Sequence, residues 1–236
     1  MKVAALISGG KDSALALYYA LKRGLEVSKI VTLIPLSEDS WMFHYPNAHL
    51  TRLFAEASGI PLVSKETSGR RDEELEDLKN ILAKLDIQGL VFGAVASRYQ
   101  KERIDRICEE LGVKSIAPLW GEDPYRVLDS LIKLRFEVIV VGVYAHGFDD
   151  SWLGRRIDAQ TIQALTELNR KFGVSPIGEG GEYETLVLDA PFFIRKIKII
   201  KSEKVWKRYS GYMNVLDAEL EDKTLSGEFG RCSPPD

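Results

Sequence analysis

The chain of 236 residues contains little cysteine and histidine, which limits the metal and redox chemistry that it can support. Its two cysteines, Cys108 and Cys232, form no C-x-x-C pair, and this argues against a disulfide framework and a cysteine zinc site. The three histidines are scattered without the spacing of metal ligands, so we expect no zinc site. Cys108 falls on an apolar helical stripe, and we expect it to lie in the core.

Long apolar runs and a strong charge of one sign are also missing. No run is long enough to span a bilayer, and a strand pattern begins almost at Met1, so we expect no membrane span, no signal peptide and a cytoplasmic location. A net charge of −3 argues against a generally basic surface, so we expect no stable binding of nucleic acid. An apolar content of 45% is that of an ordinary globular protein.

Strand and helix patterns alternate over the first half of the chain. Apolar runs predict strands at residues 2–7, 30–36, 60–64, 90–95 and 113–117. Between them, apolar stripes of helical period predict helices at residues 11–23, 47–58, 71–85 and 99–111. This order predicts an α/β fold with a parallel five-stranded sheet and right-handed crossovers. Gly121, Asp123 and Pro124 mark a boundary, so we predict a first domain over residues 1–121.

The second half of the chain predicts a smaller α+β domain over residues 122–222. Helices are expected at residues 125–134 and 158–172, and strands at residues 137–144, 186–188 and 194–200, with one or two more up to about residue 221. The last residues, 223–236, show little periodicity, and we expect a mobile or loosely docked tail.

One short segment, Ser8-Gly9-Gly10-Lys11-Asp12-Ser13, joins the first strand to the first helix. Glycines allow positive φ and close approach of a ligand, and the first N–H groups of a helix can bind an anion. The segment is neither a Walker A loop nor a dinucleotide fingerprint. Lys11 adds a positive charge, so this phosphate loop (residues 8–13) predicts a site for phosphate or pyrophosphate rather than an ordinary capped turn.

A second segment, residues 179–186, combines paired glycines with three carboxylates within six residues. Such a density of carboxylates favours binding of a cation or a metal, and it raises pKa values where the groups are partly buried. From composition alone, a solvated acidic turn fits the same residues equally well.

The phosphate loop resembles the pyrophosphate loop of the N-type ATP pyrophosphatases, whose members adenylate a substrate and release pyrophosphate. Together with Glu-Gly-Gly-Glu-Tyr-Glu-Thr at residues 179–185, it resembles the diphthine–ammonia ligase family. Further similar segments are residues 93–100, Arg103, 111–112, 117–120 and 153–155, so the resemblance extends to about Pro191. Residues 39–44 follow the family pattern only loosely. The resemblance implies an adenine nucleotide alpha-hydrolase-like (Rossmann-like) fold. It also implies that residues 1–121 are an N-type ATP pyrophosphatase, nucleotide-binding domain and that residues 122–222 are a substrate-binding C-terminal domain.

The resemblance also implies a reaction. A family member converts diphthine on elongation factor two to diphthamide, using ATP, Mg²⁺ and ammonium and releasing AMP and pyrophosphate. Two alternatives remain: a tRNA-modifying adenylating enzyme with the same loop, and a nucleotide-binding regulator without turnover. Thiolating relatives usually need a cysteine pair, which this chain lacks. A homodimer is left open as the oligomeric state.

Site residues follow from the motifs and from the resemblance. Lys11, Asp12 and Glu182 are the expected catalytic residues; Asp12 would hold the metal or cap the helix, and both roles stay open. The expected nucleotide-binding residues are Ser8, Gly9, Gly10, Lys11, Asp12, Ser13, Leu33, Gly93, Tyr99 and Arg103. The expected substrate-binding residues are Ser97, Gln100, Trp120, Glu179, Gly180, Gly181, Glu182, Tyr183, Glu184 and Thr185. For the trimethylammonium group of diphthine, the expected partners are Glu179, Glu182, Glu184, Tyr183 and Trp120.

Overall fold

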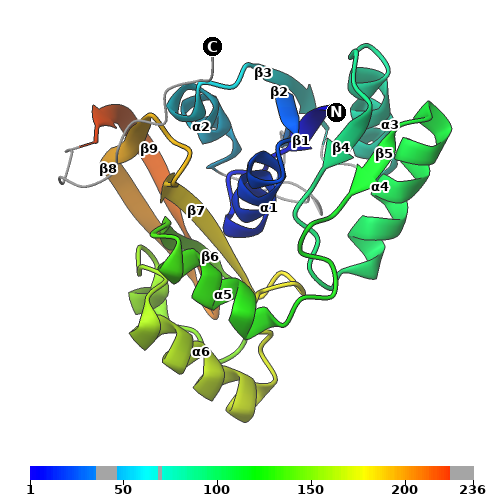
Figure 1. Ribbon diagram of the computed structural model, residues 1–236. Coiled ribbons are helices and arrows are strands. Elements are labelled where there is room, and N and C mark those ends of the chain that lie inside the picture. The colour runs from blue at the N-terminus through cyan, green and yellow to red at the C-terminus, as the bar shows by residue number, and fades with distance from the viewer. Residues whose placement is uncertain (36–46, 69–70, 224–236) are drawn as a thin grey trace.

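The fold is described by a computed structural model that covers residues 1–35, 47–68 and 71–223 (Figure 1). The loosely matching residues 39–44, Cys232 and nearly all of the predicted tail lie outside these ranges. None of the helices in the described ranges is both long and apolar enough to cross a membrane.

The first sheet has five parallel strands in the order β3-β2-β1-β4-β5, which confirms the predicted parallel sheet. Its strands are β1 (Lys2–Leu6), β2 (Glu26–Pro35), β3 (Leu62–Thr67), β4 (Gly89–Val91) and β5 (Lys114–Ile116). The chain first builds outward from β1 on one side and then crosses to the other side with β4. The loops after β1 and β4 therefore leave in opposite directions, and ligands of such sheets bind in the crevice that this reversal opens.

Helices cover both faces of this sheet. They are α1 (Lys11–Lys22), α2 (Thr51–Ser58) with the short η1 (Asn47–Leu50) before it, α3 (Arg71–Leu82) and α4 (Arg98–Leu111). Alternate residues of β1 pack on opposite sides: Val3 and Ala5 join the core with α1 and α2, while Ala4 and Leu6 join the core with α3 and α4. Cys108 of α4 is buried in that second core, as predicted, and its burial raises the pKa of the thiol to about 12.

The second sheet is antiparallel, with the order β7-β6-β9-β8. Its strands are β6 (Glu137–Val143), β7 (Tyr183–Asp189), β8 (Arg195–Lys207) and β9 (Ser210–Asp222), and its helices are α5 (Pro124–Lys133), α6 (Ala159–Phe172) and the short η2 (Asp150–Trp152). Helices and an antiparallel sheet together form the predicted α+β part. In Figure 1, α1 and α2 lie between the two sheets.

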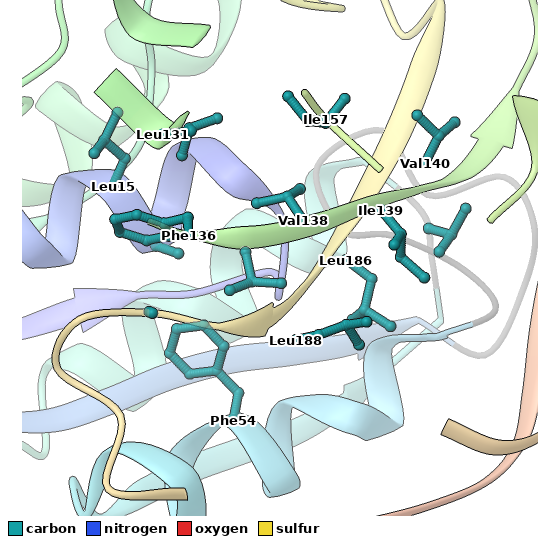
Figure 2. Close-up of a cluster of buried hydrophobic side chains, with 14 of the residues drawn as sticks. Leu15, Phe54, Leu131, Phe136, Val138, Ile139, Val140, Ile157, Leu186 and Leu188 are labelled. Carbon is teal, nitrogen blue, oxygen red and sulfur yellow. The ribbon is translucent and has the colours of Figure 1, made fainter. Parts of the chain in front are cut away.

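One hydrophobic core joins the two parts. Figure 2 shows Leu15 of α1 and Phe54 of α2 in the same cluster as Leu131 of α5 and Val138 of β6. This core continues across the predicted boundary at residue 121, so the division into two domains stays a prediction.

Two strand boundaries differ from the predicted ones in a way that matters for the site. The strand predicted at residues 90–95 ends at Val91, so residues 92–97 are free to form a loop at the sheet edge. The strand predicted at residues 186–188 begins at Tyr183, because its edge pairs with β6 from Val143 onward. Glu182 and Glu184 interrupt the apolar run here, so the sequence did not predict this start. Half of residues 179–186, here called the acidic segment, therefore belongs to β7.

Replacing Asp158 with alanine should lower the free energy of unfolding by about 1 kcal/mol. Asp158 is the N-cap of α6, and its Oδ1 accepts a hydrogen bond from the Thr161 N–H at 2.8 Å. This bond lowers the pKa of the Asp158 carboxyl group. The Asp158 cap therefore stabilises the fold fully at pH values above about 3.9, the pKa of an aspartate in the unfolded chain. This stabilisation is lost as the pH falls through the lower pKa that Asp158 has in the folded state. Urea unfolding at neutral and acid pH measures this, and a difference between wild type and variant that stays constant in acid would contradict it.

Candidate active site

The phosphate loop turns sharply between β1 and α1. Gly9 adopts a φ of +89°, which a side chain would disfavour, and Gly10 is the extended N-cap of α1. The Ser13 hydroxyl donates to the Gly10 carbonyl at 3.0 Å and accepts from the Ser8 N–H at 3.4 Å. These bonds hold the loop in a shape that leaves the positive end of the α1 dipole at the crevice, as anion binding requires.

Strand β7 closes against this loop from the other sheet. The Val187 N–H donates to the Gly9 carbonyl at 3.0 Å, and the Lys11 N–H donates to the Thr185 hydroxyl at 3.1 Å. Thr185, expected to bind substrate, thus contacts the backbone of the phosphate loop. The two segments singled out in the sequence are in direct contact.

Gly93 lies where the loops after β1 and β4 cross. A Cβ atom on Gly93 would lie 2.5 Å from the carbonyl carbon of Asp12 and 2.5 Å from the amide nitrogen of Ser13. Only glycine allows the two backbones to approach this closely. Gly93 therefore positions the start of α1, whatever contact it makes with a nucleotide.

Lys11 is buried, with 3% of its surface exposed, and its ammonium group contacts residues from α1, from the loop before β7 and from β7 itself. Its Nζ donates to the Ile177 carbonyl at 2.6 Å and to Asp12 Oδ2 at 2.9 Å, and it lies 5.0 Å from the ring centre of Tyr183. Burial opposes the charge, but Asp12, followed by Tyr183 and Glu179, outweighs it and raises the pKa of Lys11. The site thus contains a permanent, pre-oriented cation.

The two carboxylate oxygens of Asp12 differ in their hydrogen bonding. Oδ2 accepts from Lys11, whereas Oδ1 is buried without a hydrogen-bond partner in the described part of the chain. Neither oxygen accepts a backbone N–H of α1 among those residues, so the structure gives the capping role no support. A buried, orphaned carboxylate oxygen suits a hard cation.

No group of three or more metal-ligating side chains occurs in the described ranges. Proteins usually bind Mg²⁺ through one or two carboxylates, with substrate phosphates and water as the other ligands. Asp12 fits that role.

Glu179 connects the acidic segment to the loop after β4. Its Oε1 accepts from the N–H groups of Val95 and Ala96, at 2.8 and 2.7 Å. Its Oε2 is buried with no hydrogen-bond partner in the described residues. The backbone of Val95 and Ala96 is a part of the site that the sequence did not reveal, because any residue type supplies an N–H group.

Glu182 holds its own loop together. Its Oε1 accepts from the Ser175 N–H at 3.0 Å, and its Oε2 accepts from the Gly180 N–H at 2.8 Å. Gly181 has a φ of +78°, which completes the turn. The catalytic role of Glu182 stays a prediction; the bonds seen here are those of a residue that shapes the loop carrying Ile177 and Glu179.

Replacing Glu182 with alanine should reduce turnover more than replacing it with glutamine, because glutamine retains one acceptor oxygen and alanine retains none. The loss of each backbone bond should cost about 0.5–1.5 kcal/mol of loop stability. The rate of limited proteolysis at residues 175–182 measures the stability of the loop, and steady-state kinetics measure turnover. Equal losses of turnover with unchanged proteolysis would instead support a direct catalytic role.

Tyr183 and Glu184 point in different directions, because successive residues of a strand face opposite sides. Tyr183 is buried, its hydroxyl donates to the Pro176 carbonyl at 2.6 Å, and burial raises its pKa to about 12. Glu184 lies on the other side, where its Oε2 is 3.5 Å from the Tyr144 hydroxyl. Tyr144, which the sequence did not single out, thus joins the site region.

Four further predicted residues lie at the N-cap or in the first half of α4: Ser97, Tyr99, Gln100 and Arg103. Ser97 is the N-cap of α4 and accepts from the Gln100 N–H at 3.3 Å. The guanidinium of Arg103 lies 3.4 Å from the ring centre of Tyr99 and donates to the Tyr99 carbonyl at 3.2 Å. Their predicted roles toward nucleotide or substrate stay predictions.

Trp120 and Leu33 differ in exposure. Trp120 is 37% exposed, with Lys101 Nζ 5.4 Å from its ring centre, and the next residue, Gly121, donates to the Val95 carbonyl at 2.9 Å. Trp120 is therefore next to the loop that binds Glu179. The side chain of Leu33 is buried in the core with α3 and α4, so only its backbone could face a ligand.

Comparisons with known proteins agree over most of the chain. Models of the diphthamide synthase N-terminal and C-terminal domains match residues 1–115 and 123–220. Human diphthine–ammonia ligase is 34% identical over 254 residues, which cover 96% of this chain and 95% of that protein. The Danio rerio diphthine–ammonia ligase is 32% identical, covering 95% of this chain and 98% of that protein. The Schizosaccharomyces pombe protein of the same name is 34% identical over 87% of this chain, which spans 37% of that protein.

Proposed function

The chain belongs to the diphthamide synthase family, and from this premise we propose that it is an ATP-dependent amide ligase that converts diphthine on elongation factor two to diphthamide. Ammonium would be the nitrogen source, and AMP and pyrophosphate would be the other products. The protein substrate, ammonium, Mg²⁺ and a cytoplasmic location are all parts of this proposal.

The observation that carries the proposal is the position of Lys11. It belongs to the phosphate loop, yet its ammonium group is held by the carbonyl of Ile177, 166 residues further along the chain. Together with the hydrogen bond from the Lys11 N–H to Thr185 of the segment typical of the family, this contact supports one site shared by the loop and that segment. A cation fixed in advance stabilises charge that develops on a leaving pyrophosphate without reorganising during the reaction.

Asp12 would hold Mg²⁺ through its buried Oδ1, next to the ammonium group of Lys11. When bound, the metal would neutralise phosphate charge alongside Lys11. Activation of the diphthine carboxylate as an adenylate needs no covalent nucleophile from the protein, because the α-phosphate accepts the carboxylate oxygen and pyrophosphate departs. Ammonia then attacks the acyl carbon and AMP departs.

The test incubates the full chain with α-labelled ATP, Mg²⁺, ammonium and elongation factor two carrying diphthine. We expect labelled AMP to form in a stoichiometric ratio to one new amide, which mass spectrometry identifies on the modified histidine. Elongation factor two that lacks diphthine is the control and should release no AMP. Formation of ADP, or formation of AMP that depends on tRNA, would overturn the proposal.

A further inference from the structure

Most of the side chains expected to bind the trimethylammonium group of diphthine are already occupied. Lys11 lies over the ring of Tyr183, and Lys101 lies over the ring of Trp120. Backbone N–H groups bind one carboxylate oxygen of Glu179 and both of Glu182. In the expected set only Tyr183 and Glu184 belong to β7, and Glu184 lies on the face of the strand opposite Tyr183.

Three strands bring aromatic rings to the side of Glu184. In the second sheet Glu184 of β7 pairs with Gly142 of β6, and Gly142 pairs with Tyr212 of β9. Directly paired residues project from the same face of a sheet, so Glu184 and the half-buried Tyr212 flank Gly142.

The ring of Tyr144 lies over Gly142, and its hydroxyl is 3.5 Å from Glu184 Oε2. A Cβ atom on Gly142 would lie 2.6 Å from the Tyr144 hydroxyl oxygen and 3.0 Å from two of its ring carbons. The absence of a side chain at Gly142 therefore lets the Tyr144 ring fold back across the sheet toward Glu184. Tyr144 is nevertheless 43% exposed, which is high for a ring packed on a sheet.

This face of β7 continues onto the phosphate loop. Leu186, two residues after Glu184, projects from the same face, and its Cδ1 lies 3.8 Å from the position of a Cβ on Gly9. In Figure 2, Leu186 and Leu188 lie on the side of the strand that faces Phe54 of α2, whereas Val140 and Ile157 lie on the other side of β6. Two residues of a strand span about 7 Å, so Glu184 lies within the reach of one side chain from the phosphate loop.

We propose that Tyr144, Glu184 and Tyr212 form the subsite that binds the trimethylammonium group of the substrate. A quaternary ammonium group has no hydrogen to donate, so aromatic faces and a nearby carboxylate are the groups that recognise it. The diphthine side chain carries this cation together with the carboxylate to be activated, and the face of β7 that holds Glu184 also reaches the phosphate loop through Leu186. This inference rests on the proposed function and adds the residues that select the substrate.

The kinetic test measures KM and kcat for elongation factor two carrying diphthine, using Tyr144→Ala, Tyr144→Phe and Glu184→Gln. Tyr144→Ala and Glu184→Gln should raise KM about 5- to 30-fold with a smaller change in kcat. Tyr144→Phe should stay close to wild type, because it keeps the ring. Tyr209→Ala removes a tyrosine that is 77% exposed in the turn between β8 and β9 and is the matched control. An unchanged KM in both Tyr144→Ala and Glu184→Gln would overturn the inference.

A binding test separates this inference from the proposed function. Ligand-observed NMR measures binding of tetramethylammonium chloride to the full chain, with sodium chloride at equal ionic strength as the reference. Wild type and Tyr144→Phe should bind the probe, and Tyr144→Ala should bind it at least about fivefold more weakly. No binding to wild type, or equal binding to Tyr144→Ala, would overturn the subsite even if amide is formed. If wild type binds the probe but forms no amide, only the proposed function fails.

Discussion

Replacing Lys11 with methionine is expected to lower the rate of AMP formation by about 10²- to 10³-fold, the size of effect seen when one pre-oriented electrostatic group is removed from an active site. Methionine has a similar length and is apolar, so it fills the buried space without the charge. The pyrophosphate would then leave without the cation that Asp12 and Ile177 hold in place. Single-turnover measurement of labelled AMP gives the rate of this step directly.

The same substitution should also lower the free energy of unfolding, by about 1–3 kcal/mol. The Ile177 carbonyl loses its donor and the Asp12 carboxylate loses its ion pair. The Asp12 side chain is 29% exposed, so water screens part of that loss. Lys22→Met, at the exposed end of the same helix, is the control and should change the rate less than about twofold. A Lys11→Met protein that forms AMP at the wild-type rate would remove Lys11 from the mechanism.

Replacing Gly93 with alanine is the second change with a large expected effect. One added methyl group would lie 2.5 Å from backbone atoms of Asp12 and Ser13, and backbone cannot move aside as a side chain can. The start of α1 must therefore shift, which should cost about 1–3 kcal/mol of folding free energy. The N–H groups that would face the phosphates shift with it, so nucleotide affinity should fall at least about tenfold.

Calorimetric titration with a non-hydrolysable ATP analogue measures the affinity, and urea unfolding measures the stability. Gly24→Ala is the matched control: Gly24 has a φ of +72° but nothing within 4 Å of an added Cβ. It should lose about 1–2 kcal/mol of stability from backbone strain, with unchanged affinity. If Gly93→Ala bound the analogue as wild type does, the crossing of the two loops would not control the site.

Local patterns in the sequence were sufficient to predict the first sheet, because each strand and each helix has its own apolar periodicity. They failed at the start of β7, where Tyr183 and Thr185 are buried. Glu182 and Glu184 alternate with these residues, so the apolar run in the sequence begins only at Leu186. The ranges of β4 and β7 depend on pairing with strands far away in the chain, which no local pattern encodes.

The candidate site divides in the same way. Lys11 and Asp12 could be predicted, because their residue types carry the chemistry and the glycines beside them mark the loop. The Ile177 carbonyl and the N–H groups of Val95 and Ala96 could not, because main-chain groups leave no signature in the sequence. Tyr144 was missed for another reason: it contacts Glu184 only because Gly142 lets its ring lie across the sheet.

The contact between β7 and the phosphate loop has a consequence for how the protein is made. Gly9 and Lys11 are translated well before their partners Val187 and Thr185, which follow more than 170 residues later. A nascent chain that already contains all five strands of the parallel sheet still lacks β7 and the carbonyl that orients Lys11. The contacts that complete the phosphate loop can therefore form only once residues 177–187 have been translated, after the whole parallel sheet.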